Sequence, residues 1–137
     1  MKEINVKTAN EFHEWQRVNL PSSLVIQDLD SWAVVISDSK KDYVPCGLFE
    51  LKRSFEEVDK WSPYKDDYSN YKALFTFATK ASLPFFTIYF KKGGPLIRVA
   101  WFEVRDVNAE KNDWIVYDKE ILTSDQLKKK ILDLTNL

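Results

Sequence analysis

Three residues, Asp30, Glu50 and Lys52, are the strongest candidates for chemistry in this sequence. Glu50 and Lys52 belong to the run 47–52, which is predicted to be a β-strand because its other residues are mainly apolar. Side chains two residues apart on a strand project from the same face. Asp30 lies just before the apolar run 32–36, which we expect to be the preceding strand, buried because apolar residues occupy both of its faces. A hairpin through the polar residues between the two runs would bring Asp30 and Glu50 together at one end of a sheet.

A divalent cation suits such a pair of carboxylates. Two carboxylates in a partly buried site raise each other's pKa, and a cation between them removes that cost. Mg²⁺ prefers oxygen ligands, keeps several waters and is typically held by one or two protein carboxylates. We therefore expect Asp30, Glu50 and the backbone carbonyl of Leu51 to bind Mg²⁺ or Mn²⁺. Lys52 beside them can position or help deprotonate an attacking water and offset phosphate charge, so the expected reaction is phosphodiester hydrolysis.

The amino-acid composition excludes several other kinds of catalytic site. The chain has one cysteine, Cys46, and one histidine, His13, so most zinc sites and Ser-His or Cys-His nucleophiles are excluded unless His13 serves. A single cysteine cannot form an internal disulfide, and the start of the chain has no apolar signal-like region. No apolar stretch is long enough to span a bilayer. We expect a cytoplasmic protein without membrane contact or organic cofactor.

The elements that must position the candidate residues follow an α/β order. Thr8 and Glu11 have the spacing of a capping box, which predicts a helix over 8–19. Thr123 and Gln126 predict the start of a final helix in the same way. The order helix, strands, helix, strands, helix is typical of a single layered α/β domain over 1–137. Between these helices we expect strands near 24–36, 47–52, 85–90, 97–104 and 114–117, a helix over 67–81 and helical turns within 54–61.

An Asp followed on a neighbouring strand by Glu-x-Lys resembles the PD-(D/E)XK nuclease superfamily, which has the restriction-endonuclease-like fold. The resemblance implies a central mixed sheet flanked by helices with an αβββαβ core over about 8–104. Residues 105–137 would add a C-terminal strand and helix. It also implies that Asp30 and Glu50 are metal ligands and that Lys52 is the catalytic lysine. The family's proline before the aspartate is replaced here by Leu29.

Two assignments within this resemblance stay open. Asp28 has the same parity as Asp30 in an extended segment, although Asp30 directly adjoins the apolar strand. Many members of the family carry a glutamate on the first helix that reaches the metal, and Glu11 is the best match by its face of the helix. Glu11 also has a structural role as the acid of the capping box, and Glu14 lies at the edge of the same face.

The resemblance implies a magnesium-dependent nuclease that acts on DNA, with Arg53, Lys80, Lys91 and Lys92 as candidate phosphate contacts. The net charge of −1 counts mildly against nucleic-acid binding, because phosphates favour a basic surface. It motivates an alternative: a catalytically inactive nuclease-like domain that binds nucleic acid or a protein partner. A third alternative is an unrelated α/β module. If the chain is a nuclease, three options stay open: recognition of DNA structure, action as a homodimer like the family's junction resolvases, or service in a larger complex.

Overall fold

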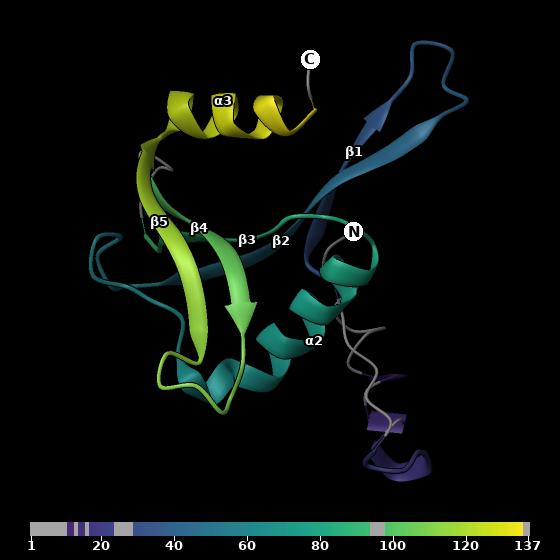
Figure 1. Ribbon diagram of the computed structural model, residues 1–137, viewed down its shortest axis with the longest axis vertical. Helices are drawn as coiled ribbons and strands as arrows, with labels where there is room; N and C mark the ends of the chain where they lie inside the picture. The colour runs from purple at the N-terminus through teal and green to yellow at the C-terminus, as the bar shows by residue number, and fades with distance from the viewer. Residues whose placement is uncertain (1–10, 13, 16, 24–28, 94–97, 136–137) are drawn as a thin grey trace.

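In the part of the chain that the structure describes, five strands form one mixed sheet with helices on both faces (Figure 1). The computed structural model describes residues 11–135 apart from 13, 16, 24–28 and 94–97. Its elements are β1 (Ser31–Ile36), β2 (Tyr43–Ser54), the 3₁₀ turn η1 (Lys65–Asp67), α2 (Tyr68–Lys80), β3 (Phe85–Lys91), β4 (Arg98–Val107), β5 (Ile115–Thr123) and α3 (Ser124–Thr135). The predicted α/β class is confirmed at this level.

The strands follow each other in space in the order β1-β2-β3-β4-β5. Neighbouring strands are antiparallel, except that β2 and β3 run parallel. Parallel neighbours need a long crossover connection, and here η1 and α2 supply it. The end of β2 is therefore joined to the start of α2, and α2 returns the chain to the start of β3.

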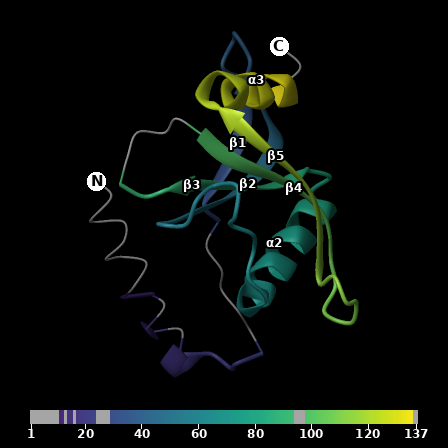
Figure 2. The ribbon, with the colours of Figure 1, turned by 90° about the vertical axis from the view of Figure 1, so that its left-hand side faces the viewer.

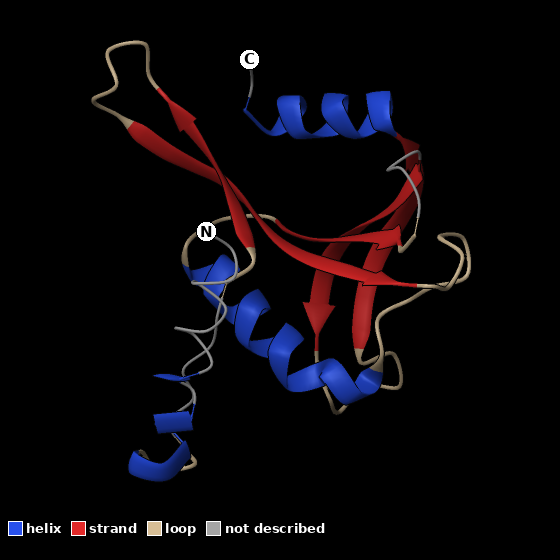
Figure 3. Cartoon of the chain, turned by 180° about the vertical axis from the view of Figure 1, so that it is seen from behind, coloured by secondary structure: helices blue, strands red, loops and turns tan. Residues whose placement is uncertain are grey.

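The two long helices cover opposite faces of the sheet (Figures 2 and 3). On one face, Tyr71, Leu74 and Ala78 of α2 pack with Leu48 and Phe85. On the other face, α3 residues pack against a second apolar cluster. That cluster contains Phe49, Phe86, Ile88, Val99, Trp101 and Leu122, with Leu127, Ile131 and Leu134 of α3 against it. The alternation of side chains along β2 thus places Leu48 and Phe49 in different cores.

The predicted hairpin between the first two described strands is present. Ser37 N–H donates to the carbonyl of Asp42 at 3.0 Å, and Lys40 in the turn has a φ of 59°. β1 is less buried than its apolar sequence predicts, because it is the edge of the described sheet. Trp32 is 55% exposed and Ile36 is 54% exposed. The prediction of a buried strand is therefore wrong, although the strand itself exists.

The remaining predicted helices and strands agree only in part with the structure. The described residues of 11–19 are helical, whereas 8–10 and all of 24–26, the first part of the expected strand region 24–36, lie outside the described part of the chain. Residues 55–64 form bends and turns, and of the helical turns predicted there only a single one forms, in which the Trp61 N–H donates to the Glu57 carbonyl at 3.1 Å. β5 runs to Thr123, well beyond the predicted end. No helix among the described residues combines the length and apolar character needed to cross a membrane.

The capping box of α3 is formed as predicted. Thr123 Oγ1 accepts from the Gln126 N–H at 3.3 Å, and Gln126 Oε1 accepts from the Thr123 N–H at 2.8 Å.

Thr123→Ala should lower the free energy of unfolding by about 1 kcal/mol, because one N–H at the helix start loses its partner. Urea denaturation measures the change. Thr76→Ala, at an exposed position within α2, is the matched control and should be neutral or slightly stabilising. Equal losses in both variants would contradict the role of the cap.

Candidate active site

Glu50 is a buried acid on an interior strand. β2 lies between β1 and β3, and Glu50 pairs in register with Thr87 of β3. Glu50 is 5% exposed, whereas the neighbouring Leu51, whose side chain alternates to the other face, is 41% exposed. An edge-strand pair of charges facing water, the structural alternative for Glu50 and Lys52, is excluded by this position. A buried carboxylate of this kind requires polar partners, because isolated charges are costly to bury.

Asp30 meets Glu50 just before β1 begins. Its Oδ2 accepts a hydrogen bond of 3.0 Å from the Leu51 N–H. The Asp30 carboxyl group also lies close enough to that of Glu50 to form a hydrogen bond with it when one of the two is protonated, which raises the pKa of Glu50. The two predicted carboxylates therefore converge at one end of the hairpin, as strand parity requires. Asp28, the rival to Asp30, lies outside the described residues.

The pKa of Glu50 is raised to about 7. Burial is the main cause, and the hydrogen bond with Asp30 and its negative charge raise the pKa further. The hydrogen bond from Asn70 and the positive charge of Lys52 act in the opposite direction. Near neutral pH, then, the pair Asp30–Glu50 readily holds one proton in the absence of other cations. A carboxyl pair that retains a proton so strongly also favours a bound cation in its place.

Lys52 joins Glu50 to α2. Its Nζ lies 3.6 Å from Glu50 Oε2 and 2.7 Å from Asp67 Oδ2. Burial lowers the pKa of Lys52, but the hydrogen bond with Asp67 and the charge of Glu50 raise it more, so the pKa lies above its ordinary value. Lys52 is therefore an ammonium ion in this state. In this arrangement it acts as a fixed positive charge beside the carboxylates rather than as a base.

Asp67 and Asn70 complete the site from the start of α2. The Asn70 Nδ2 donates to Glu50 Oε2, and Asp67 forms the ion pair with Lys52. Sequence reasoning did not single out either residue. A signal was available, because polar residues three apart at the start of a helix lie on one face, next to the buried Tyr71. Only the crossover geometry, however, shows that this face meets β2.

The donor set fits an ion of the magnesium type. It offers the carboxylates of Asp30 and Glu50, and the Leu51 N–H that binds Asp30 points to the same side of the strand as the Leu51 carbonyl. Within the described residues, no group of three or more His, Cys, Asp and Glu side chains could hold a metal. A site with two carboxylates suits a cation that keeps most of its waters and does not suit zinc.

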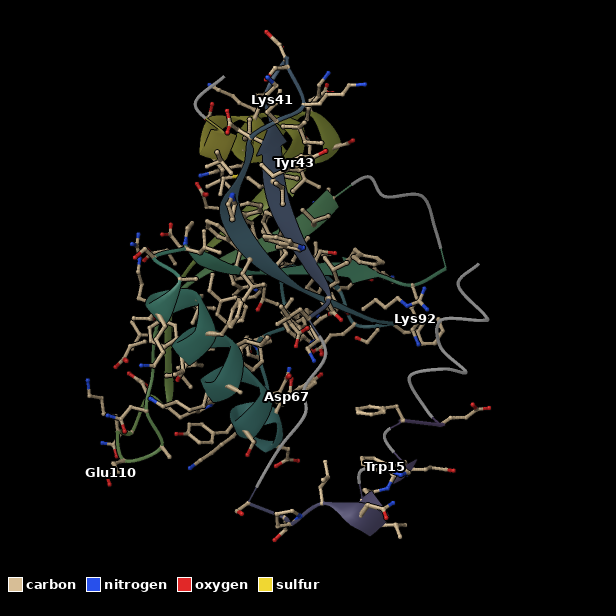
Figure 4. The ribbon with its side chains drawn as sticks, turned by 90° about the vertical axis from the view of Figure 1, so that its right-hand side faces the viewer. Trp15, Lys41, Tyr43, Asp67, Lys92 and Glu110 are labelled. Atoms are coloured by element: carbon tan, nitrogen blue, oxygen red, sulfur yellow. The ribbon has the colours of Figure 1, made fainter. Side chains whose placement is uncertain are left out.

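The structure does not bring Glu11 to these carboxylates. Glu11 is exposed on the helical segment 11–19, and so is the alternative, Glu14. Neither joins Asp30 and Glu50 in a metal-binding group of the described residues. Trp15 of that segment is separated from Asp67 in Figure 4. The assignment of Glu11 as a fourth catalytic residue therefore has no support from the geometry.

Three of the four predicted phosphate-binding residues lie at the ends of β2 and β3. Arg53, Lys91 and Lys92 line a pocket of about 410 Å³ together with the exposed ring of Phe55. Lys91 pairs with Glu57, and the Lys92 Nζ lies 5.6 Å from the centre of the Phe55 ring. Lys80, in contrast, is the last residue of α2, at the opposite end of this helix from Asp67.

A second pocket adjoins Lys52 directly. Its volume is about 360 Å³. The lining includes Lys52 and Arg53 from β2, Trp61 and Tyr64 from the segment before α2, and Asp67 and Tyr71. Trp61 belongs to the apolar core and is 3% exposed. The sequence did not predict that the turns over 55–64 form the wall of a pocket.

Comparisons of the chain with protein-family models, curated proteins and solved structures found no match.

The raised pKa of Glu50 makes the folded state less stable as pH rises. An unfolded glutamate loses its proton near 4.5, whereas folded Glu50 keeps it until about 7. Across that window the folded state binds the extra proton, so its stability falls with increasing pH. In metal-free buffer, the free energy of unfolding of wild type should fall between about pH 5 and pH 8 as Glu50 loses its proton. That of Glu50→Gln lacks this change, so the variant should gain about 2 kcal/mol over wild type across this interval.

Urea denaturation of both proteins at the two pH values measures this change. Glu110→Gln, in the exposed turn between β4 and β5 and away from Asp67, is the control and should leave the pH dependence of wild type unaltered (Figure 4). The burial argument would be wrong if Glu50→Gln kept the same pH dependence as wild type.

Proposed function

We propose that the protein is a magnesium- or manganese-dependent nuclease of the PD-(D/E)XK type that hydrolyses phosphodiester bonds in DNA. One observation carries the proposal. Asp30, which precedes β1, meets Glu50 and Lys52 of β2, although it lies 20 residues before Glu50 in the chain. The buried carboxyl group of Glu50, together with the exposed carboxyl group of Asp30 and the lysine ammonium, suits metal-assisted hydrolysis of this kind.

The order of elements supports the same proposal. A hairpin of β1 and β2 is followed by α2 and then by β3, which pairs parallel to β2. The restriction-endonuclease-like core has this sequence of strands, helix and strand. The remaining strand of that core would fall near 24–28, outside the described residues. β4, β5 and α3 extend the sheet and cover its second face.

Each residue has a distinct part in the proposed reaction. Asp30, Glu50 and the Leu51 carbonyl would hold the metal, which supplies positive charge and lowers the pKa of water. Lys52 places its ammonium where it can hold a phosphate oxygen and offset developing negative charge. Asn70 fixes the Glu50 carboxylate by a hydrogen bond, and Asp67 fixes Lys52. In the reaction, water oxygen bonds to phosphorus while the bond from phosphorus to the bridging oxygen breaks, leaving a phosphomonoester and a hydroxyl group.

Loss of Lys52 or Glu50 should abolish cleavage. With Mg²⁺ or Mn²⁺ and plasmid, single-stranded and branched DNA as substrates, Lys52→Ala should slow cleavage by about 100-fold or more, because one preorganised charge is removed. Glu50→Ala should lose activity at least as severely, because it also removes a metal ligand. Gel assays of initial rates measure both effects.

Lys41→Ala is the matched control for Lys52→Ala. Lys41 is exposed in the turn of the β1–β2 hairpin, away from Asp67 (Figure 4), and its loss should leave the rate unchanged. DNA cleavage that persists in both Glu50→Ala and Lys52→Ala would exclude this site as the source of activity.

The cations at the ends of β2 and β3 should contribute to DNA affinity. Lys92→Ala should weaken binding to all sequences alike and lower the salt dependence of the affinity by about one phosphate contact. Fluorescence anisotropy over a range of salt concentrations measures both quantities. Lys80→Ala, at the other end of α2, should have little effect. If Lys80→Ala weakened DNA binding more than Lys92→Ala, the DNA would lie on another surface of the protein.

A second candidate function is a nuclease-like domain that binds nucleic acid or a protein without catalysis. The small number of carboxylates favours it, since two rather than three or more acidic side chains meet in the described part of the chain. Calorimetric titration with Mn²⁺ separates the two proposals. Binding that is lost in Glu50→Ala favours the nuclease, whereas absence of both binding and cleavage favours the inactive domain. Homodimerisation stays a prediction.

A further inference from the structure

The pocket beside Lys52 has a preformed aromatic wall. Trp61 stacks on Tyr89 with ring centres 4.4 Å apart and an angle of 9° between the planes. Its other neighbour, Phe102, lies edge-on at 5.5 Å. Tyr89 is itself fixed, because its hydroxyl donates to the Glu56 carbonyl at 2.6 Å. The turns over 55–64 are therefore held against the sheet even though they contain no helix.

Tyr64 presents its ring at the open side of this wall. It is 56% exposed, and its ring meets Trp61 edge-on with centres 5.9 Å apart. The Tyr64 hydroxyl donates to Glu56 Oε2 at 3.3 Å, which limits rotation of the ring. An exposed aromatic ring held in this way offers a flat surface on which another planar group can stack.

The remaining lining groups match the chemistry of a nucleotide. Arg53 and Lys52 supply positive charge at one side of the pocket, suitable for a phosphate. Asp66 supplies a carboxylate, which can accept a hydrogen bond from the amino group of a base. Lys52 belongs both to the candidate site and to the pocket. A DNA strand with a phosphate at Glu50 and Lys52 would therefore place an adjacent base at the pocket entrance.

Only an unpaired base can enter. In a duplex, the bases are stacked on each other and their faces are covered. A base can therefore bind in an aromatic pocket only after it leaves the stack. Duplex binding also depends on many phosphate contacts, whereas the chain carries a net charge of −1 and its clustered cations near the site are few. Base stacking supplies affinity that does not require further positive charge.

We propose that this pocket binds an unpaired base of single-stranded DNA, stacked on Tyr64, next to the phosphate that lies at the candidate site. The inference rests on the proposed function for the identity of its ligand. It assigns a substrate class, single-stranded DNA or an unpaired end, and makes Tyr64 the residue that discriminates against duplex.

Binding of a labelled single-stranded oligodeoxynucleotide of about 12 nucleotides in EDTA tests the proposal without cleavage. Tyr64→Ala should weaken binding by about tenfold or more, since one base loses its stacking surface. Tyr64→Phe keeps the ring and should bind nearly as wild type. Tyr43→Ala is the matched control, because Tyr43 is 61% exposed on the β1–β2 hairpin, away from Asp67 (Figure 4). The duplex of the same sequence should bind more weakly and respond little to Tyr64→Ala.

Equal affinity of wild type and Tyr64→Ala for the single strand would overturn the pocket assignment, and so would tighter binding of the duplex. Circular dichroism of Tyr64→Ala checks that an observed loss does not come from unfolding, and the unaffected duplex affinity makes the same check in the binding assay. Cleavage assays of wild type then separate the two proposals. Single-strand binding that depends on Tyr64, without any cleavage, supports the pocket and overturns the nuclease.

Discussion

The burial of one carboxyl group, that of Glu50, is the constraint on which the candidate site depends. An acid in the interior strand of a sheet displaces an apolar residue from the core and must be supplied with partners. Here those partners come from three directions: Asp30 from the hairpin, Lys52 from the same strand and Asn70 from α2. The cost of burying Glu50 appears in its raised pKa, and it is the kind of cost that proteins accept at functional sites.

The parallel pairing of β2 and β3 explains why the partners lie where they do. A parallel pair needs a crossover, and the crossover brings the start of α2 to the end of β2. Sites in α/β sheets commonly lie at the carboxyl ends of parallel strands for this reason. The same connection carries the turns over 55–64, of which Val58 and Trp61 pack on β3 and β4. The site and the pocket beside it are thus two results of one topological feature.

The sequence predicted those parts of the site that depend on local periodicity. Strand parity placed Glu50 and Lys52 on one face, and the hairpin placed Asp30 next to them. The sequence could not predict the exposure of β1, because exposure of a strand depends on which neighbours it has in the sheet. Asp67 and Asn70 were missed for a similar reason: their role depends on the packing of α2 against β2. In the segment 54–61, Ser54 and Glu57 have the spacing of a capping box, which favours helical turns, yet the tertiary packing of Trp61 and Val58 dominates there.

The end of β2 also explains how one short segment can serve two kinds of contact. Consecutive side chains of a strand point to opposite faces, so Lys52 turns toward α2 while Arg53 turns toward the other face. Although its side chain leaves the strand on the opposite face from Lys52, Arg53 lines both pockets at the end of β2, the aromatic one beside Lys52 and the basic one with Lys91 and Lys92. A nucleic-acid backbone that crosses the end of β2 would meet cations on both sides of the strand. Its base would then face the aromatic wall on the α2 side alone, because on the other side the ring of Phe55 already lies beneath Lys92. The two pockets therefore lie on opposite faces of β2 and have different linings, because successive side chains of this strand alternate between its faces.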